Sequence, residues 1–119
     1  MSARYIEAYL HGTRIGVLVE LETVDDFATR TDEFQTLAKE LAMQIAAANP
    51  EFVGGPDLNN VISIADQSHL PQDADSSLLT QKFIKDPTKT VADRIRDAEA
   101  QLGVNIRVVR FVRFEAGAA

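Results

Sequence analysis

Alternation of apolar and polar side chains along residues 14–22 limits this chain more than any other feature. The apolar positions are Ile15, Val17, Val19 and Leu21, and the positions between them include Arg14, Gly16, Glu20 and Glu22. Because successive side chains of a strand point to opposite faces, this spacing predicts a strand with one apolar face. Another apolar segment, Tyr5 to His11, precedes it across the short Gly12-Thr13 connection, which suits a hairpin. The apolar face has to be covered by helices.

Two helices are predicted to supply that cover. The first begins near Thr31, whose hydroxyl can cap it, and cannot continue far past Pro50. Its apolar residues follow at helical spacing and are Phe34, Leu37, Leu41, Ile45 and Ala48. The second begins at Thr90 in a capping-box type of start and ends at Gly103. Its buried stripe is Val91, Ile95, Ala98 and Leu102.

The remaining segments complete the expected order of elements. Residues 51–77 change character and are predicted to form a long connection, marked by turn residues around one short apolar stretch. A strand from Leu78 to Lys85, a turn at Asp86-Pro87 and a last strand from Asn105 to Glu115 follow. The order ββα, connection, βαβ predicts an α+β fold with helices on one face of a mainly antiparallel sheet of three or four strands. Residues 1–119 are expected to form one domain.

Composition and charge argue against several classes of function. The net charge of -6 disfavours a nucleic-acid partner, which is bound through clustered Lys and Arg. No apolar run approaches the ~20 residues that span a bilayer, and the start lacks the pattern of a secretory signal. Cysteine is absent, which is compatible with the cytoplasm. No nucleophile, base and anion-binding set can be assembled, so neither catalytic residues nor a metal site nor a cofactor is predicted.

The face of the sheet that should point away from the helices also carries apolar side chains. If the strands are neighbours, five of these residues form an apolar centre with a charged rim that includes Arg107 and Arg113. They are Tyr5, Tyr9, Leu18, Val109 and Phe111. Such a patch is typical of an interface. Two explanations stay open: the long connection folds over the patch, or two copies of the chain pair through their sheets.

Three stretches resemble the core, or dimerisation, domain of the translation elongation factor Ts (EF-Ts) family. They are RIGVLVELETVDDFATRTDEF (14–34), LAKELAMQIAAANP (37–50), and Leu78 to Glu115, which contains FIKDPTKTV and ends in NIRVVRFVRFE. The resemblance leaves Val53 to Ser77 unexplained. Members of this family usually begin with a small helical domain of the ubiquitin-associated type, which has no counterpart in this sequence.

A short loop within the first stretch corresponds to the family's signature loop, and its flanks RIGVLVEL and ATRTDEF support the match. The family's Thr-Asp-Phe tripeptide matches Asp25, Asp26 and Phe27. The resemblance implies that Phe27 wedges between helices of the GTPase EF-Tu and that Asp26 perturbs the nearby Mg²⁺ site. Asp25 departs from the family's Thr, and the sequence leaves open whether its charge assists or weakens docking. The structural alternative is that Phe27 packs as a hydrophobic staple on the following helix, beside two solvated turn residues.

The resemblance implies a guanine-nucleotide exchange factor that binds EF-Tu·GDP and promotes GDP release during elongation. Such a protein acts through its GTPase partner and is not itself an enzyme. A homodimer is implied too, because short members reach by pairing an arrangement that long members build from two core subdomains. The alternative is a non-catalytic dimeric binding or assembly module that retains the EF-Ts core. The expected location is the cytoplasm, or an organelle matrix for a nuclear-encoded copy.

Overall fold

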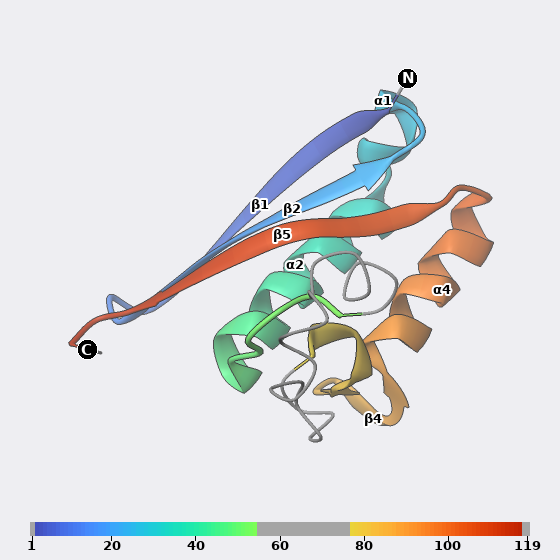
Figure 1. Ribbon diagram of the computed structural model, residues 1–119. Coiled ribbons are helices and arrows are strands. Elements are labelled where there is room, and N and C mark those ends of the chain that lie inside the picture. Colours follow the sequence, from blue (N-terminus) through green and yellow to red (C-terminus); the bar gives the residue numbers. More distant parts are fainter. Residues whose placement is uncertain (1, 55–76, 118–119) are drawn as a thin grey trace, which may run out of the picture.

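A three-stranded antiparallel sheet forms one layer of the protein. The computed structural model describes residues 2–54 and 77–117. Strands β1 (Ala3–His11) and β2 (Ile15–Thr23) form the predicted hairpin, and β5 (Ile106–Glu115) pairs with the other side of β2. The sheet order is therefore β1-β2-β5, and Figure 1 shows these strands as one long, twisted layer.

Two long helices cover one face of this sheet, as predicted. They are α2 (Asp32–Ala48) and α4 (Val91–Leu102), and both lie on the same side of the three strands in Figure 1. The predicted caps are confirmed: the Thr31 hydroxyl accepts from the Phe34 amide, and Thr90 forms a capping box. A one-turn helix that the sequence did not predict, α1 (Asp26–Thr29), joins β2 to α2.

The hydrophobic core lies between the sheet and the two helices. Strand β2 contributes Val17, Val19 and Leu21; α2 contributes Phe34, Leu37, Leu41 and Ile45; α4 contributes Val91, Ile95 and Ala98. All of these side chains are at most 6% exposed. Burial of each large apolar side chain stabilises the fold by roughly 1.5–3 kcal/mol, which explains why the apolar periodicity located the helix faces correctly.

The segment before α4 differs from the prediction. In place of one strand from Leu78 to Lys85 there are a 3₁₀ turn η3 (Leu78–Thr80) and a two-residue strand β3 (Lys82–Phe83). The turn falls at residues 84–85, and the predicted turn at Asp86-Pro87 is instead the start of β4 (Asp86–Thr90). Strands β3 and β4 form a separate two-stranded sheet, so the main sheet has three strands.

A buried amide from α2 holds this irregular segment in place. The side chain of Gln44 is fully buried. Its Nε2 donates to the Lys82 carbonyl and to Gln81 Oε1, both at 3.1 Å, and its Oε1 accepts from the Ile84 amide at 2.9 Å. Two of these bonds therefore satisfy backbone groups of the irregular segment, the Lys82 carbonyl and the Ile84 amide.

The two ends of the predicted connection 51–77 lie side by side. Residues 55–76 of that connection, and the explanation that it covers the sheet, lie outside the described residues. Phe52 and Ser77 form a parallel bridge, and the Leu78 amide donates to the Phe52 carbonyl at 2.9 Å. Gly54 has φ +88°, and a Cβ there would collide with the Ser77 hydroxyl, so only glycine fits. The chain therefore leaves and rejoins the described fold at one place.

Candidate functional site

The most exposed large apolar side chain in the described part of the chain is Phe27, on α1. Its exposed fraction is 79%. Val24, just before α1, is 45% exposed, and Asp25 and Asp26 between them are also exposed. A ring this exposed does not pack on α2, so the hydrophobic-staple interpretation is wrong. An aromatic side chain left in water, on a folded support, is typical of a partner-binding residue.

Asp25 has a structural task beside that ring. It is the N-cap of α1, and its Oδ1 accepts a hydrogen bond from the Ala28 amide at 3.1 Å. Asp26 occupies the first turn of α1, where a carboxylate is favoured by the exposed amides of a helix start. The site therefore presents one exposed apolar ring directly after two acidic residues in the chain.

The register of the sheet corrects the predicted interface. Three of its five residues lie directly opposite buried residues of β2 and share the core face. The pairs are Tyr5 with Leu21, Tyr9 with Val17 and Phe111 with Val19. The Tyr5 ring packs edge-on against Phe34, with ring centroids 5.3 Å apart. The prediction that Tyr5, Tyr9 and Phe111 point away from the helices is therefore wrong.

The length of the hairpin turn explains this error for Tyr5 and Tyr9, whereas the face of Phe111 follows from an irregularity in the pairing of β5 with β2. A two-residue Gly12-Thr13 connection would pair His11 with Arg14 and would place Tyr5 opposite Glu20, on the outward face. The turn includes Arg14 as well, so His11 pairs with Ile15. A shift of one residue turns every side chain of a strand to the other face.

The other two predicted interface residues have different positions. Leu18 points outward as predicted and is 48% exposed. Val109 is half-buried at an irregularity of β5, where Glu20 pairs with Arg110 but Leu21 pairs with Val108. An irregularity of this kind leaves one residue without a partner opposite it.

A different set of apolar residues occupies the outward face. We call it the outer patch, and it consists of Ile6, Ala8, Leu10, Leu18, Val112 and Phe114. Leu10 and Phe114 are 74% and 73% exposed and flank Gly16. Among its six members, only Leu18 was in the predicted set. The interface idea therefore keeps its face of the sheet but changes its residues.

The other half of the outward face is charged and paired within the chain. Glu20 accepts from Arg110 at 2.7 Å and from Arg4 at 3.0 Å. Glu22 accepts from Arg107 at 2.9 Å. Hydrogen bonds, from Arg110 above all, hold the pKa of Glu20 below its ordinary value, and bonds from Ser2 and then Arg107 do the same for the pKa of Glu22. Arg113, predicted as part of this rim, instead donates to the Ala46 carbonyl on the helix side.

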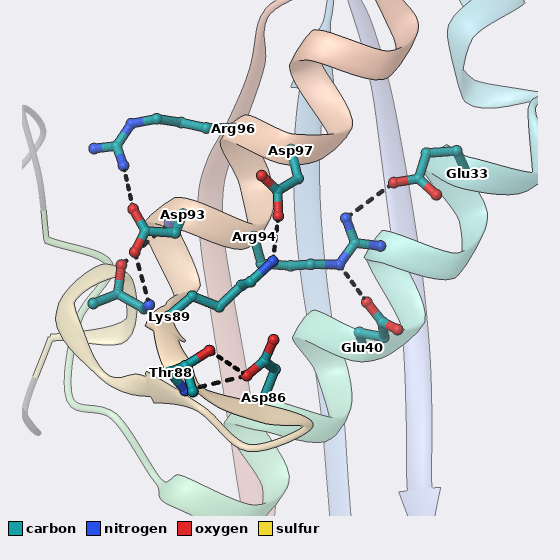
Figure 2. Close-up of polar contacts among 10 residues, drawn as sticks. Glu33, Glu40, Asp86, Thr88, Lys89, Asp93, Arg94, Arg96 and Asp97 are labelled. Carbon is teal, nitrogen blue, oxygen red and sulfur yellow. Dashed lines mark hydrogen bonds and ion pairs between the residues drawn. The ribbon is translucent and has the colours of Figure 1, made fainter.

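A cluster of three charged side chains, Arg94, Glu33 and Glu40, joins the two helices, as Figure 2 shows. The Arg94 guanidinium of α4 donates to Glu33 at 2.9 Å and to Glu40 at 2.7 Å, both on α2. Burial lowers the pKa of Arg94, but the bonds to Glu40 and Glu33 outweigh burial and raise it. A guanidinium that stays charged cannot exchange protons near neutral pH, so this group is structural.

Residues 2–54 and 77–117 contain neither a metal-binding cluster nor a membrane-spanning helix. No three His, Asp or Glu side chains there are grouped so as to hold a metal ion. No helix in the same ranges is both long and apolar enough to cross a membrane.

Comparison with known proteins gives consistent matches. A protein-family model described as Elongation factor TS matches residues 1–74. The elongation factor Ts of Thermoanaerobacter sp. (strain X514) is 39% identical over 136 positions, covering 94% of this chain and 67% of the relative. That of Methylacidiphilum infernorum is 41% identical with the same two coverages, and that of Carboxydothermus hydrogenoformans is 39% identical, covering 94% of this chain and 63% of the relative. The chain thus spans about two thirds of the length of these relatives.

Proposed function

Because this chain belongs to the elongation factor Ts family, we propose that it binds EF-Tu·GDP and promotes release of the nucleotide. Membership of the family gives a role in translation elongation. The exchange step is the finer proposal, and the observation that supports it is the exposed Phe27 on a folded helix. We propose that the protein acts in the cytoplasm, where elongation takes place.

Exchange of this kind needs no covalent chemistry. If the protein binds the nucleotide-free GTPase more tightly than the GDP form, GDP must bind the complex correspondingly less tightly. We assign the wedge to Phe27 and the perturbation of the Mg²⁺ side to Asp26. Asp25, which stands where the family has Thr, keeps the helix cap through its carboxylate and adds a charge beside the wedge.

The exposure of the Phe27 ring bears on the energy available for this step. Burial of a fully exposed Phe side chain contributes roughly 1.5–3 kcal/mol. A free energy of 1.4 kcal/mol corresponds to about a tenfold change in an equilibrium constant. Loss of the ring should therefore reduce, by about ten- to a hundredfold, the factor by which the protein weakens GDP binding to EF-Tu.

The test is release of a fluorescent GDP analogue from EF-Tu in the presence of excess unlabelled GDP. We expect the protein to accelerate release at substoichiometric amounts, and Phe27→Ala to reduce that acceleration about ten- to a hundredfold. Ile84→Ala is the control, because Ile84 is also exposed (42%) but lies on the turn between β3 and β4. Unchanged kinetics for Phe27→Ala would remove the wedge role.

The outer patch supports a second candidate, a dimeric binding module that retains the fold without accelerating exchange. We propose that two copies pair through this patch, whose apolar residues are otherwise left in water. Binding to EF-Tu without faster GDP release would favour the module over the exchange factor. A protein that pairs through the outer patch can also accelerate exchange, so a test of its oligomeric state does not replace the test of GDP release.

A further inference from the structure

The helix that carries Phe27 is too short to be stable by itself. Helix α1 has four residues, one turn, and forming a first turn is unfavourable because several dihedrals are fixed for one hydrogen bond. The Phe27 ring, being 79% exposed, makes too few contacts to fix its own direction. Whatever holds the backbone of α1 therefore decides where the ring points.

Every carbonyl of α1 accepts a hydrogen bond, and side chains supply three of the donors. The bonds are Thr29 Oγ1 to the Asp26 carbonyl (2.7 Å), the Arg30 amide to that of Phe27 (3.1 Å), the Thr31 amide and Oγ1 to that of Ala28 (3.2 and 2.8 Å), and Gln35 Nε2 to that of Thr29 (3.3 Å). These are the groups that a helix end leaves without partners within the helix.

Thr31 is the only one of these donors that also caps the next helix. Its Oγ1 donates to the Ala28 carbonyl at 2.8 Å and accepts from the Phe34 amide at 3.2 Å. A hydroxyl has one donor and two acceptor sites, so both bonds form at once. One oxygen atom thus joins the end of α1 to the start of α2.

The helix to which α1 is joined is firmly placed. Phe34 is fully buried and packs edge-on against Tyr5 of β1. Glu33, the residue before it, is held from α4 by Arg94, as Figure 2 shows. The Thr31 hydroxyl therefore ties the turn that carries Phe27 to one of the most constrained points of the described fold.

We propose that Thr31 is a positioning residue for Phe27: its hydroxyl, as donor to Ala28, holds α1 in the orientation in which the ring meets EF-Tu. This inference rests on the exchange function proposed above. A group that is already held in its bound orientation loses less entropy on binding, so loss of the tether should slow exchange. A Thr31 that served only as the cap of α2 would need its acceptor role alone.

Three variants separate the two roles of the hydroxyl. Thr31→Asn keeps both an acceptor for the Phe34 amide and a donor for the Ala28 carbonyl. The Asp side chain of Thr31→Asp has nearly the same shape as Asn and is also a good N-cap, but its ionised carboxylate cannot donate a hydrogen bond. Thr31→Val removes donor and acceptor without adding charge. We expect the melting temperature to fall by about 4–8 °C for Val, since a cap is lost, and to stay near the Thr31 value for Asn and Asp.

The first readout needs no partner: backbone order parameters of residues 26–29, measured by ¹⁵N relaxation. We expect values of about 0.85 for the unmodified protein and Thr31→Asn, and values below about 0.6 for Thr31→Asp and Thr31→Val. Rigid α1 amides in Thr31→Asp and Thr31→Val would overturn the proposal. Mobile α1 amides in the unmodified protein would overturn it as well, because no tether would then exist.

The second readout is release of the fluorescent GDP analogue from EF-Tu. We expect Thr31→Asp and Thr31→Val to accelerate release about tenfold less than Thr31→Asn. A loss confined to Thr31→Asp would show an effect of charge and would count against positioning. If the unmodified protein accelerates nothing, the proposed function fails, while the order parameters still decide whether Thr31 holds α1.

Discussion

Among the described residues, Arg94 of α4 forms ion pairs with two carboxylates of α2. Its side chain is 12% exposed, and those of Glu33 and Glu40 are 21% and 14% exposed. Loss of the guanidinium would remove the ion-pair partner of Glu33 and would leave Glu40 with only the longer 3.9 Å pair to the half-exposed Lys85. A partly buried charge whose partner is removed costs more than the original pair contributed.

We predict that Arg94→Met lowers the free energy of unfolding by about 1–3 kcal/mol. Methionine keeps the apolar stem and removes only the charge. Arg96→Met is the matched control. Arg96 lies on the same helix and is 67% exposed, and its one ion pair among the described residues is with Asp93. Arg96→Met should change the free energy by less than about 0.5 kcal/mol. Urea unfolding measures both, and equal losses would contradict the role given to Arg94.

The predictability of single residues depends on where their partners lie in the sequence. Thr31 and Thr90 were correctly predicted as caps because the amides they bind are three residues away. The exposed Phe27 was picked out through the resemblance, not through periodicity. Gln44 gave no signal, because its partners lie 37–40 positions away on a segment without regular structure. The start of the short helix at residues 26–29 does have a sequence signal, because Asp25 is one of the residue types favoured at an N-cap.

At the scale of elements, strands were easier to predict than the faces they present. Both strands of the hairpin, both long helices and the last strand were predicted correctly, because each segment is rich in apolar residues, whereas the apolar residues of β1 and β5 lie on both faces. The face that each side chain of β1 presents depends on whether Arg14 belongs to the turn. The alternation of side chains along a strand does not indicate how many residues the turn contains. The prediction for residues 78–90 was wrong, because a strand of two residues, such as β3, is too short to show a period.

The charged rows across the three strands lead to a prediction about pH. The folded protein holds the pKa values of Glu20 and Glu22 below those of the unfolded chain, which are about 4.3. The ion pairs therefore stabilise the fold above that pH, and the stabilisation disappears as the pH falls through the folded-state values.

We expect the double variant Glu20→Gln/Glu22→Gln to lose less stability than the unmodified protein between pH 7 and pH 3. Urea unfolding at the two pH values gives the comparison. Glu51→Gln is the control, because Glu51 is exposed and lies outside the sheet. The same pH-dependent loss in the double variant and in the unmodified protein would mean that these pairs do not contribute to the acid sensitivity.

At the scale of the whole molecule, the two proposed surfaces belong to different parts of the fold. Phe27 lies beyond the end of β2, after Thr23, whereas Leu10 and Phe114 lie near the opposite end of the sheet. The helices cover the other face of the same strands, and Figure 1 shows them all on one side. The proposed contact of Phe27 with EF-Tu and the proposed pairing through Leu10 and Phe114 therefore use opposite ends of the sheet.

We predict that the protein is a dimer at tens of micromolar and that Leu18→Glu makes it a monomer. A glutamate at the centre of the outer patch would have to be buried without a partner, which opposes pairing. Ile84→Glu is the control, since Ile84 is comparably exposed (42% against 48%) but lies outside the sheet. Light scattering measures the masses. A monomeric parent, or a Leu18→Glu variant that is destabilised with unchanged mass, would rule out pairing through this face.

The antiparallel order of the sheet also decides how the protein can be handled. Strand β1 begins at the end of the sheet near α1, and β5 ends at the opposite end, where Leu10 of β1 and Phe114 of β5 flank Gly16 of β2. A tag or surface attachment before Ala3 therefore crowds the wedge, and one after Glu115 crowds the apolar end of the outer face. Choosing the end by which the molecule is immobilised chooses which of its two surfaces remains open to solution.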